Sequence, residues 1–177
     1  MQSSKKKFLI ISSIAVIIIV FAFFCALFAP SVLKYLKRSP AYEARKGLLD
    51  IFTVEISYFQ EVLKKNEKEK TNVPPQFVSA PATPKGMPTK DKRDGDWDHP
   101  SWKALKFKPK GPVRYVYEVK AKGTGKDASC EIVVIGDLDG DGETSLFMRQ
   151  VDAERAKDFD FGLDYNGAGA YIVNEME

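Results

Sequence analysis

The chain has 177 residues, 29% of them charged, and its formal net charge is only +3. Its basic residues are scattered and do not alternate with aromatic side chains, which argues against nucleic acid as a partner. About 140 residues follow the first apolar segment, which fits one small domain with a stalk.

The charges are distributed unevenly along the chain. Residues 64–110 carry 12 basic and 6 acidic side chains, whereas residues 131–177 carry 3 basic and 12 acidic ones. A basic middle and an acidic end favour electrostatic contact within the fold or head-to-tail contact between copies. A solvated polar surface explains the same pattern at least as well.

The N-terminal segment has the features of a membrane anchor. Residues 1–7 end in three lysines, and residues 8–29 form an uncharged apolar run. As a helix this run would be about 33 Å long, enough to cross a hydrocarbon core of about 30 Å. We therefore expect a cytoplasmic basic tail over 1–7 and a transmembrane helix in contact with membrane lipid over 8–29. The alternative is a cleaved signal peptide, whose apolar stretch is normally only about 7–15 residues long.

Residues 30–70 predict a stalk that contains a second, amphipathic helix. Ser39 is expected to cap this helix and Pro40 to occupy its first position. Apolar residues then recur at helical spacing and mark one stripe: Ala44, Leu48, Ile51, Phe52, Phe59, Val62 and Leu63. Glu55 interrupts the stripe, and the charged run over 64–70 is expected to fray into solvent.

Residues 71–100 are rich in proline, which leaves little room for a helix or a central strand, so we expect a long irregular loop. Asp96, Asp98 and His99 near its end have the ligand chemistry of a divalent-ion site. A single histidine in an acidic turn is more often simply exposed. Trp97 is the expected exposed contact residue for a partner protein.

Residues 101–177 predict a small antiparallel sheet. Trp102, Leu105 and Phe107 are expected to point inward ahead of it. Apolar alternation and turn-rich intervals predict three strands, over 113–119, 130–135 and 145–151. Short loops between such strands indicate hairpins and hence antiparallel pairing. A helix packed on this sheet gives an α+β fold.

The residues with reactive side chains do not indicate an enzyme. Cys25 lies in the predicted span and Cys130 in a predicted strand, so they do not pair within one chain, and Cys130 is expected to be a small buried hydrophobe. The only histidine has no serine or cysteine partner by motif. Asp158 and Asp160 are expected to be solvated in the acidic end.

The loop between the second and third expected strands is the strongest candidate for a site. Asp137, Asp139, Asp141 and Glu143 place carboxylates at alternate positions around glycine, as at the start of a calcium loop. The twelfth position, where an EF-hand has a bidentate acid, is Met148, and the flanks are strands, so an EF-hand is excluded. Weak or structural Ca²⁺ binding by the four acids remains open beside a purely conformational hairpin turn.

Several segments, taken in order, resemble type IV pilins and pseudopilins. The first half combines a basic start, an apolar helix, Pro30 and a second half-helix that includes 43–48. Segments 102–107, 113–118 and 135–142 are similar to sheet segments of bacterial pilin-like proteins. The resemblance omits the proline-rich loop. It implies a single-pass protein of the bacterial inner membrane with a periplasmic or extracellular C-terminal domain, and pilin-like or secretion-assembly proteins as partners.

The chain departs from the pilin pattern at the prepilin cleavage site. Such pilins carry a glycine followed by Phe-Thr-Leu-Ile-Glu, where the signal peptidase cuts. Aligned on Pro30, the cut falls near Phe8 and Leu9, and Ser13 takes the glutamate position. Because the glycine and the acid are both missing, we expect the chain to stay anchored instead of forming a major filament subunit.

Two function classes follow from these observations. The first is a pilin-like structural or interaction protein of a type IV pilus, a type II secretion system or a related surface assembly, with self-association as one of its contacts. The alternative is a monomeric membrane-anchored binding module outside the cytoplasm, whose loop over 137–143 binds calcium or another ligand.

Overall fold

The computed structural model describes residues 40–160 and 169–175. Within these two ranges, no helix has both the length and the apolar character that a bilayer crossing requires. The predicted tail over 1–7, the predicted span over 8–29 and the expected cap Ser39 lie outside the described residues.

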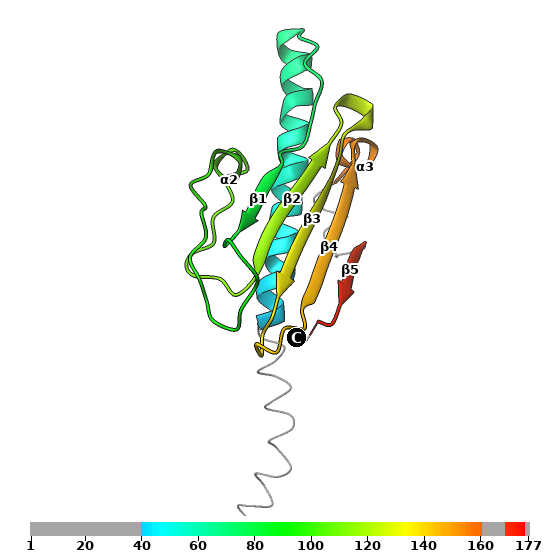
Figure 1. The fold of residues 1–177 in the computed structure, drawn as a ribbon. Helices are drawn as coiled ribbons and strands as arrows, with labels where there is room; N and C mark the ends of the chain where they lie inside the picture. Colours follow the sequence, from blue (N-terminus) through cyan, green and yellow to red (C-terminus); the bar gives the residue numbers. More distant parts are fainter. Residues whose placement is uncertain (1–39, 161–168, 176–177) are drawn as a thin grey trace, which may run out of the picture. The chain divides into compact units, whose positions relative to one another are not determined.

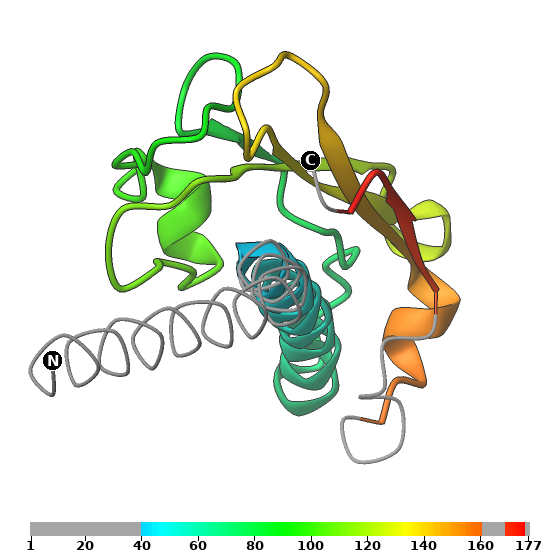
Figure 2. The same ribbon diagram turned by 90° about the horizontal axis from the view of Figure 1, so that it is seen from below.

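A long helix packs on one face of a five-stranded antiparallel sheet, which confirms the α+β class (Figure 1). The helix covers residues 40–69. The other elements are β1 (Ala80–Thr83), α2 (Pro100–Ala104), β2 (Val116–Lys122), a 3-10 turn (Gly125–Asp127), β3 (Ser129–Gly136), β4 (Ser145–Asp152), α3 (Ala153–Lys157) and β5 (Ala170–Val173). The strand order β1-β2-β3-β4-β5 follows the chain, and every neighbouring pair is antiparallel. Figure 2 shows the sheet curving around the helix, with α2 and α3 on either side of it.

The predicted apolar stripe of the 40–69 helix faces the sheet. Its residues Ala44, Leu48, Ile51, Phe52 and Phe59 are buried in one cluster with the inward-facing side chains of the strands. This burial removes apolar surface from water and is the main term that holds the helix on the sheet.

The helix does not fray where the sequence suggested. It continues through the charged run as far as residue 69. Asn66 explains this end, because its amide nitrogen donates to the Val73 carbonyl at 2.7 Å while its oxygen accepts from the Thr71 hydroxyl at 2.9 Å. These bonds tie the chain after the helix back to its last turns. The Thr71 backbone N–H also donates to the Asn66 carbonyl at 3.2 Å, which satisfies one of the carbonyls that a helix end leaves without partners.

Gly47 lies where the helix comes closest to the sheet. A methyl group added at this position would lie 2.4 Å from the Tyr117 ring carbon Cε1, and Tyr117 is itself buried.

We expect Gly47→Ala to destabilise the protein by about 1–3 kcal/mol through overpacking. Helix propensity alone predicts the opposite, a gain of about 1 kcal/mol. Denaturant unfolding of the wild type and of Gly47→Ala measures the sign of the change in unfolding free energy. The double variant Gly47→Ala, Tyr117→Phe tests which part of Tyr117 is the obstacle. If the added methyl group clashes with the ring and not with the hydroxyl, the second substitution does not restore stability.

The proline-rich segment is more ordered than its composition suggests. Most of it is irregular, as predicted, but Ala80 to Thr83 form β1, which pairs with β2 at the edge of the sheet. Pro81 is tolerated there because an edge strand leaves backbone N–H groups unpaired on one side.

The strand predicted over 113–119 starts later in the structure. Val113 instead forms an isolated bridge with Arg93, in which the two residues exchange backbone hydrogen bonds of 2.8 and 2.9 Å. The predicted alternation is nevertheless correct, because Val113, Tyr115 and Tyr117 are all buried. The strands predicted over 130–135 and 145–151 are confirmed. β3 is longer than predicted by one residue at each end, and β4 by one residue at its C-terminal end.

Trp97 is not an exposed contact residue, so that prediction is wrong. Its side chain is only 6% exposed and packs edge-on against Trp102, with the two ring centroids 5.5 Å apart. Phe107 and Tyr117 complete this aromatic cluster. The predicted inward positions of Trp102, Leu105 and Phe107 are confirmed.

The acidic end contains two elements that the sequence did not indicate. Asp152 caps α3 by accepting from the backbone N–H of Arg155 at 2.8 Å, and Asp158, which follows α3, is exposed as expected. β5 then pairs with β4 at the far edge of the sheet.

Candidate functional site

The β3–β4 loop brings three of the four predicted calcium ligands together. Asp137, Asp139 and Asp141 each offer a carboxylate oxygen, and these atoms lie within 4.8 Å of one another. Glu143 is not part of this group. In the part of the chain that the structure describes, no other group of three potential ligands lies so close together.

Asp137 also has a structural role in this loop. It is buried, and its two carboxylate oxygens accept from the backbone N–H groups of Gly140 at 2.7 Å and Gly142 at 3.3 Å. Both glycines have positive φ angles, +81° and +94°, which explains their place in the turn. A carboxylate has about four acceptor sites, so these bonds leave lone pairs that can face a cation.

The second predicted metal group is not assembled. His99 lies at the start of α2, where its Nδ1 accepts from the Ser101 backbone N–H at 3.3 Å. The Asp98 carboxylate instead faces Lys103 and Lys108, with nitrogen–oxygen distances of 3.6 and 3.7 Å. These contacts favour the simpler interpretation of an acidic surface turn.

Glu55 is an ionisable side chain in the core. It is fully buried; its Oε2 accepts from the backbone N–H of Val78 at 3.0 Å, and among the described residues Oε1 has no hydrogen-bond partner. Burial raises the pKa of Glu55 to about 8, although the Val78 hydrogen bond acts in the opposite direction. Burial also raises the pKa of the Cys130 thiol, so Cys130 behaves as the inert hydrophobe that the sequence predicted.

We call the face of the sheet that is turned away from the helix the outer face. It is divided into an apolar half and a polar half. Strand register aligns its side chains in rows across the sheet. The two rows nearest the start of β2 are mostly apolar: Val116, Ile135, Leu146 and Val173, then Glu118, Val133, Met148 and Tyr171. The two rows beyond them are polar: Lys120, Glu131 and Gln150, then Lys122, Ser129 and Asp152.

The apolar half is a layer separate from the core. Val116 and Val133 are buried but do not belong to the main core cluster, and Tyr171 is 58% exposed. Arg114, just before β2, donates its backbone N–H to Glu43 in the first turns of the helix at 2.9 Å. The apolar half therefore lies at the end of the domain where the 40–69 helix begins.

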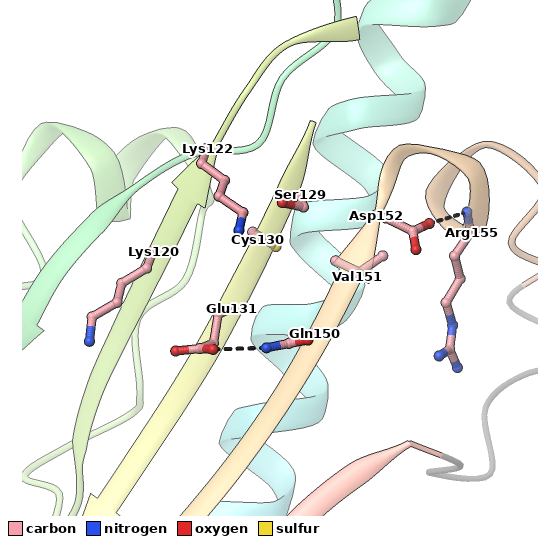
Figure 3. Close-up of a pocket in the computed structure, with 9 residues that line it drawn as sticks. All are labelled: Lys120, Lys122, Ser129, Cys130, Glu131, Gln150, Val151, Asp152 and Arg155. Atoms are coloured by element: carbon pink, nitrogen blue, oxygen red, sulfur yellow. Dashed lines mark hydrogen bonds between the residues drawn. The ribbon is translucent and has the colours of Figure 1, made fainter. Parts of the chain in front are cut away.

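The polar half surrounds a shallow hollow of about 480 Å³ (Figure 3). Lys120 and Lys122 on β2 line one side, and Arg155 of α3 lies on the other side next to Asp152. Glu131 on β3 accepts from the Gln150 amide at 2.9 Å, and Asp152 lies at the end of β4. The hollow is open and mixed in charge, and it holds no pair of side chains arranged as nucleophile and base.

The outer face was not identified from the sequence, although a signal was present. The segment over 130–135 is almost wholly apolar. It lacks the alternation of apolar and polar residues that is typical of a strand with one solvent-exposed face. Such a run indicates that both faces of β3 contact apolar groups. The matching residues Leu146 and Met148 on β4 complete the patch only when the register is known.

Comparison with known proteins adds no assignment. No protein-family model, no curated protein and no solved structure matches this chain.

Proposed function

We propose that this chain is a membrane-anchored, pilin-like subunit of a type IV pilus, a type II secretion system or a related surface assembly. In this role the segment over 8–29 holds the protein in the inner membrane, and the domain from residue 40 onward makes the protein–protein contacts.

One observation carries the proposal. A 30-residue helix, 40–69, lies along an antiparallel sheet and follows the apolar run over 8–29 after only ten residues. A long helix that is apolar first and amphipathic afterwards, with a meander sheet on its second half, is the arrangement that the resemblance to pilins and pseudopilins implies. The described residues offer no competing catalytic arrangement that this function would leave unexplained.

The intact mass of the native protein extracted from membranes tests this function. A mass that matches all 177 residues, less at most the initiator methionine, supports a permanently anchored member of an assembly. Cleavage near Phe8 with one added methyl group supports processing as a filament subunit. Recovery of the chain outside the membrane fraction, or of a form that has lost the whole apolar run, contradicts the proposal.

A second candidate function rests on the β3–β4 loop. The convergence of Asp137, Asp139 and Asp141 supports a domain that binds Ca²⁺, as a structural ion or as part of a ligand site. Oxygen ligands from carboxylates are the ligands that Ca²⁺ prefers.

Calcium is expected to stabilise the full chain if the loop binds it. At about 100 times its Kd, a ligand adds about 3 kcal/mol to the free energy of unfolding. Thermal unfolding in detergent with CaCl₂, MgCl₂ or EDTA measures this gain. Asp139→Asn should abolish the calcium shift, whereas Glu143→Gln, outside the triad, should retain it. No shift at millimolar calcium would leave the loop a purely conformational turn.

A further inference from the structure

We propose that the outer face of the sheet binds a second copy of this chain, through a two-fold axis that runs along β3 parallel to the strands. The proposal deepens the function above and rests on it, because it uses the requirement that both copies leave one membrane. The contact is isologous: the same rows of residues are used on both copies.

The apolar rows supply the driving force. A two-fold axis parallel to the strands keeps each row at its own height, so apolar rows meet apolar rows. Ile135 on β3 lies near the axis, with Leu146 and Met148 on β4 beside it and Tyr171 on β5 beyond them. Ile135, Leu146 and Met148 are half-buried and Tyr171 is exposed in the single chain, so they supply the apolar area, whereas Val116 and Val133 are already buried. Two sheets that pack face to face lie about 10 Å apart with strands about 30° from parallel, which fits side chains of this size.

The polar rows supply charge complementarity. Because the axis lies along β3, it exchanges the positions of β2 and β4 between the copies. Lys122 of one copy therefore faces Asp152 of the other, and Lys120 faces Gln150. Both lysines are exposed within the single chain. The pairing of Lys122 with Asp152 therefore occurs twice in the dimer, once on each side of the axis.

Glu131 is the one acid close to the axis. Its carboxylate accepts from Gln150, and Lys120 lies beside it on β2 in the same row. In the single chain the Lys120 ammonium lies 3.2 Å from the Glu118 carboxylate. In the dimer Lys120 of each copy lies on one side of the pair of glutamates, so the acids Glu118 and Glu131 share this cation. Lys122 and Asp152 are thus matched by a second copy of the same face, although Arg155 also lies next to Asp152 in each copy.

The direction of the axis agrees with a shared membrane. The 40–69 helix begins at the apolar end of the outer face, where Glu43 bonds to the chain before β2. A two-fold axis parallel to the strands leaves both Pro40 ends on the same side of the dimer. Rotation about an axis across the strands would place them at opposite ends of the dimer, so only one of the two ends would lie on the side of a shared membrane.

Cysteine cross-linking of the full chain in membranes tests the proposal. In a Cys25→Ser, Cys130→Ala background, a short bismaleimide should join two copies through Ile135→Cys. Tyr42→Cys is the matched control, because Tyr42 is 67% exposed and lies on the 40–69 helix, which covers the opposite face of the sheet. A homodimer adduct from Ile135→Cys alone supports the contact. Equal adducts from both positions, no adduct, or an adduct with a different protein overturns it.

Charge reversal tests the register of the contact. Lys122→Glu places like charges opposite each other twice and should weaken the dimer about tenfold. Adding Asp152→Asn removes this repulsion and keeps a good helix cap for α3, so it should recover most of the loss. Lys64→Glu makes the same charge change at an exposed position of the 40–69 helix, on the opposite side of the sheet, and should have no effect. Failure of Asp152→Asn to rescue would contradict the assigned register.

The two proposals can fail separately. A chain with the intact mass of a membrane anchor that gives no Ile135→Cys homodimer retains the proposed function and loses this contact. A chain found outside the membrane that still gives the homodimer retains the contact and loses the anchor function, together with the argument about axis direction.

Discussion

Replacing Glu55 with glutamine is expected to remove most of a pH dependence that this residue gives the fold. The pKa of Glu55 rises from 4.5 to about 8 on folding, so the native state binds a proton between these values that the unfolded state releases. Stability therefore falls as the pH rises through this window. From pH 5 to pH 8 the loss amounts to about 3 kcal/mol, which Glu55→Gln should abolish.

Guanidinium titrations of the full chain in detergent at pH 5 and pH 8 measure this difference, with the fluorescence of the buried Trp97 and Trp102 as the signal. Comparing the change between the two pH values cancels the cost of the glutamine amide, which is the same at both. Glu61→Gln, an exposed change on the same helix, should keep the wild-type pH dependence. An unchanged pH dependence in Glu55→Gln would show that this carboxyl is not the group that titrates.

Trp102→Ala is expected to cost about 4 kcal/mol of unfolding free energy, the largest effect of a single substitution that we predict. The indole is fully buried and lies against Trp97 and Phe107. Its Nε1–H donates to the carbonyl of Pro81 in β1 at 3.1 Å, so the change also leaves a carbonyl without its partner. Because the indole joins α2 to the edge strand, its loss should loosen β1 first.

Denaturant unfolding followed by circular dichroism measures this cost. Trp102→Phe keeps a ring but loses the hydrogen bond and should cost less than half as much. Tyr42→Ala, which removes a large side chain that is 67% exposed, is the control and should change stability by less than about 0.5 kcal/mol. Equal effects of Trp102→Ala and Tyr42→Ala would contradict the assigned role of the indole.

The parts of the fold that the sequence predicted are those where one physical signal dominates. The helical spacing of Ala44, Leu48, Ile51, Phe52 and Phe59 indicates a helix with one buried face, and the structure has it. β3 and β4 are continuous strands separated by a turn rich in Asp and Gly. In both cases the burial pattern alone selects the element.

The missed parts depend on tertiary contacts that local sequence does not encode. Pro81 argues against a strand, yet β1 forms because its position at the sheet edge spares the missing N–H. Trp97 follows an acidic, glycine-containing stretch, which suggests exposure, but three aromatic rings from other segments enclose it. The bonds of Asn66 to Thr71 and Val73 likewise appear only in three dimensions.

Of the two candidate sites, the sequence predicted the aspartate group but not the outer face. Alternating acids around glycine predicted the convergence of Asp137, Asp139 and Asp141, since a tight turn forces nearby side chains together. Glu143 lies one alternation further and is not in the group. The outer face required the pairing of Ile135 with Leu146 and of Val133 with Met148, and strand register cannot be read from composition.

The strand order has a consequence for how this chain matures. Each strand pairs with the strand made just before it, so the sheet can grow by one strand at a time as the polypeptide leaves the ribosome or a translocation channel. The helix that templates its inner face has already been synthesised by then. A released chain truncated before Ala170 should already contain four paired strands, with only the free edge of β4 awaiting its neighbour.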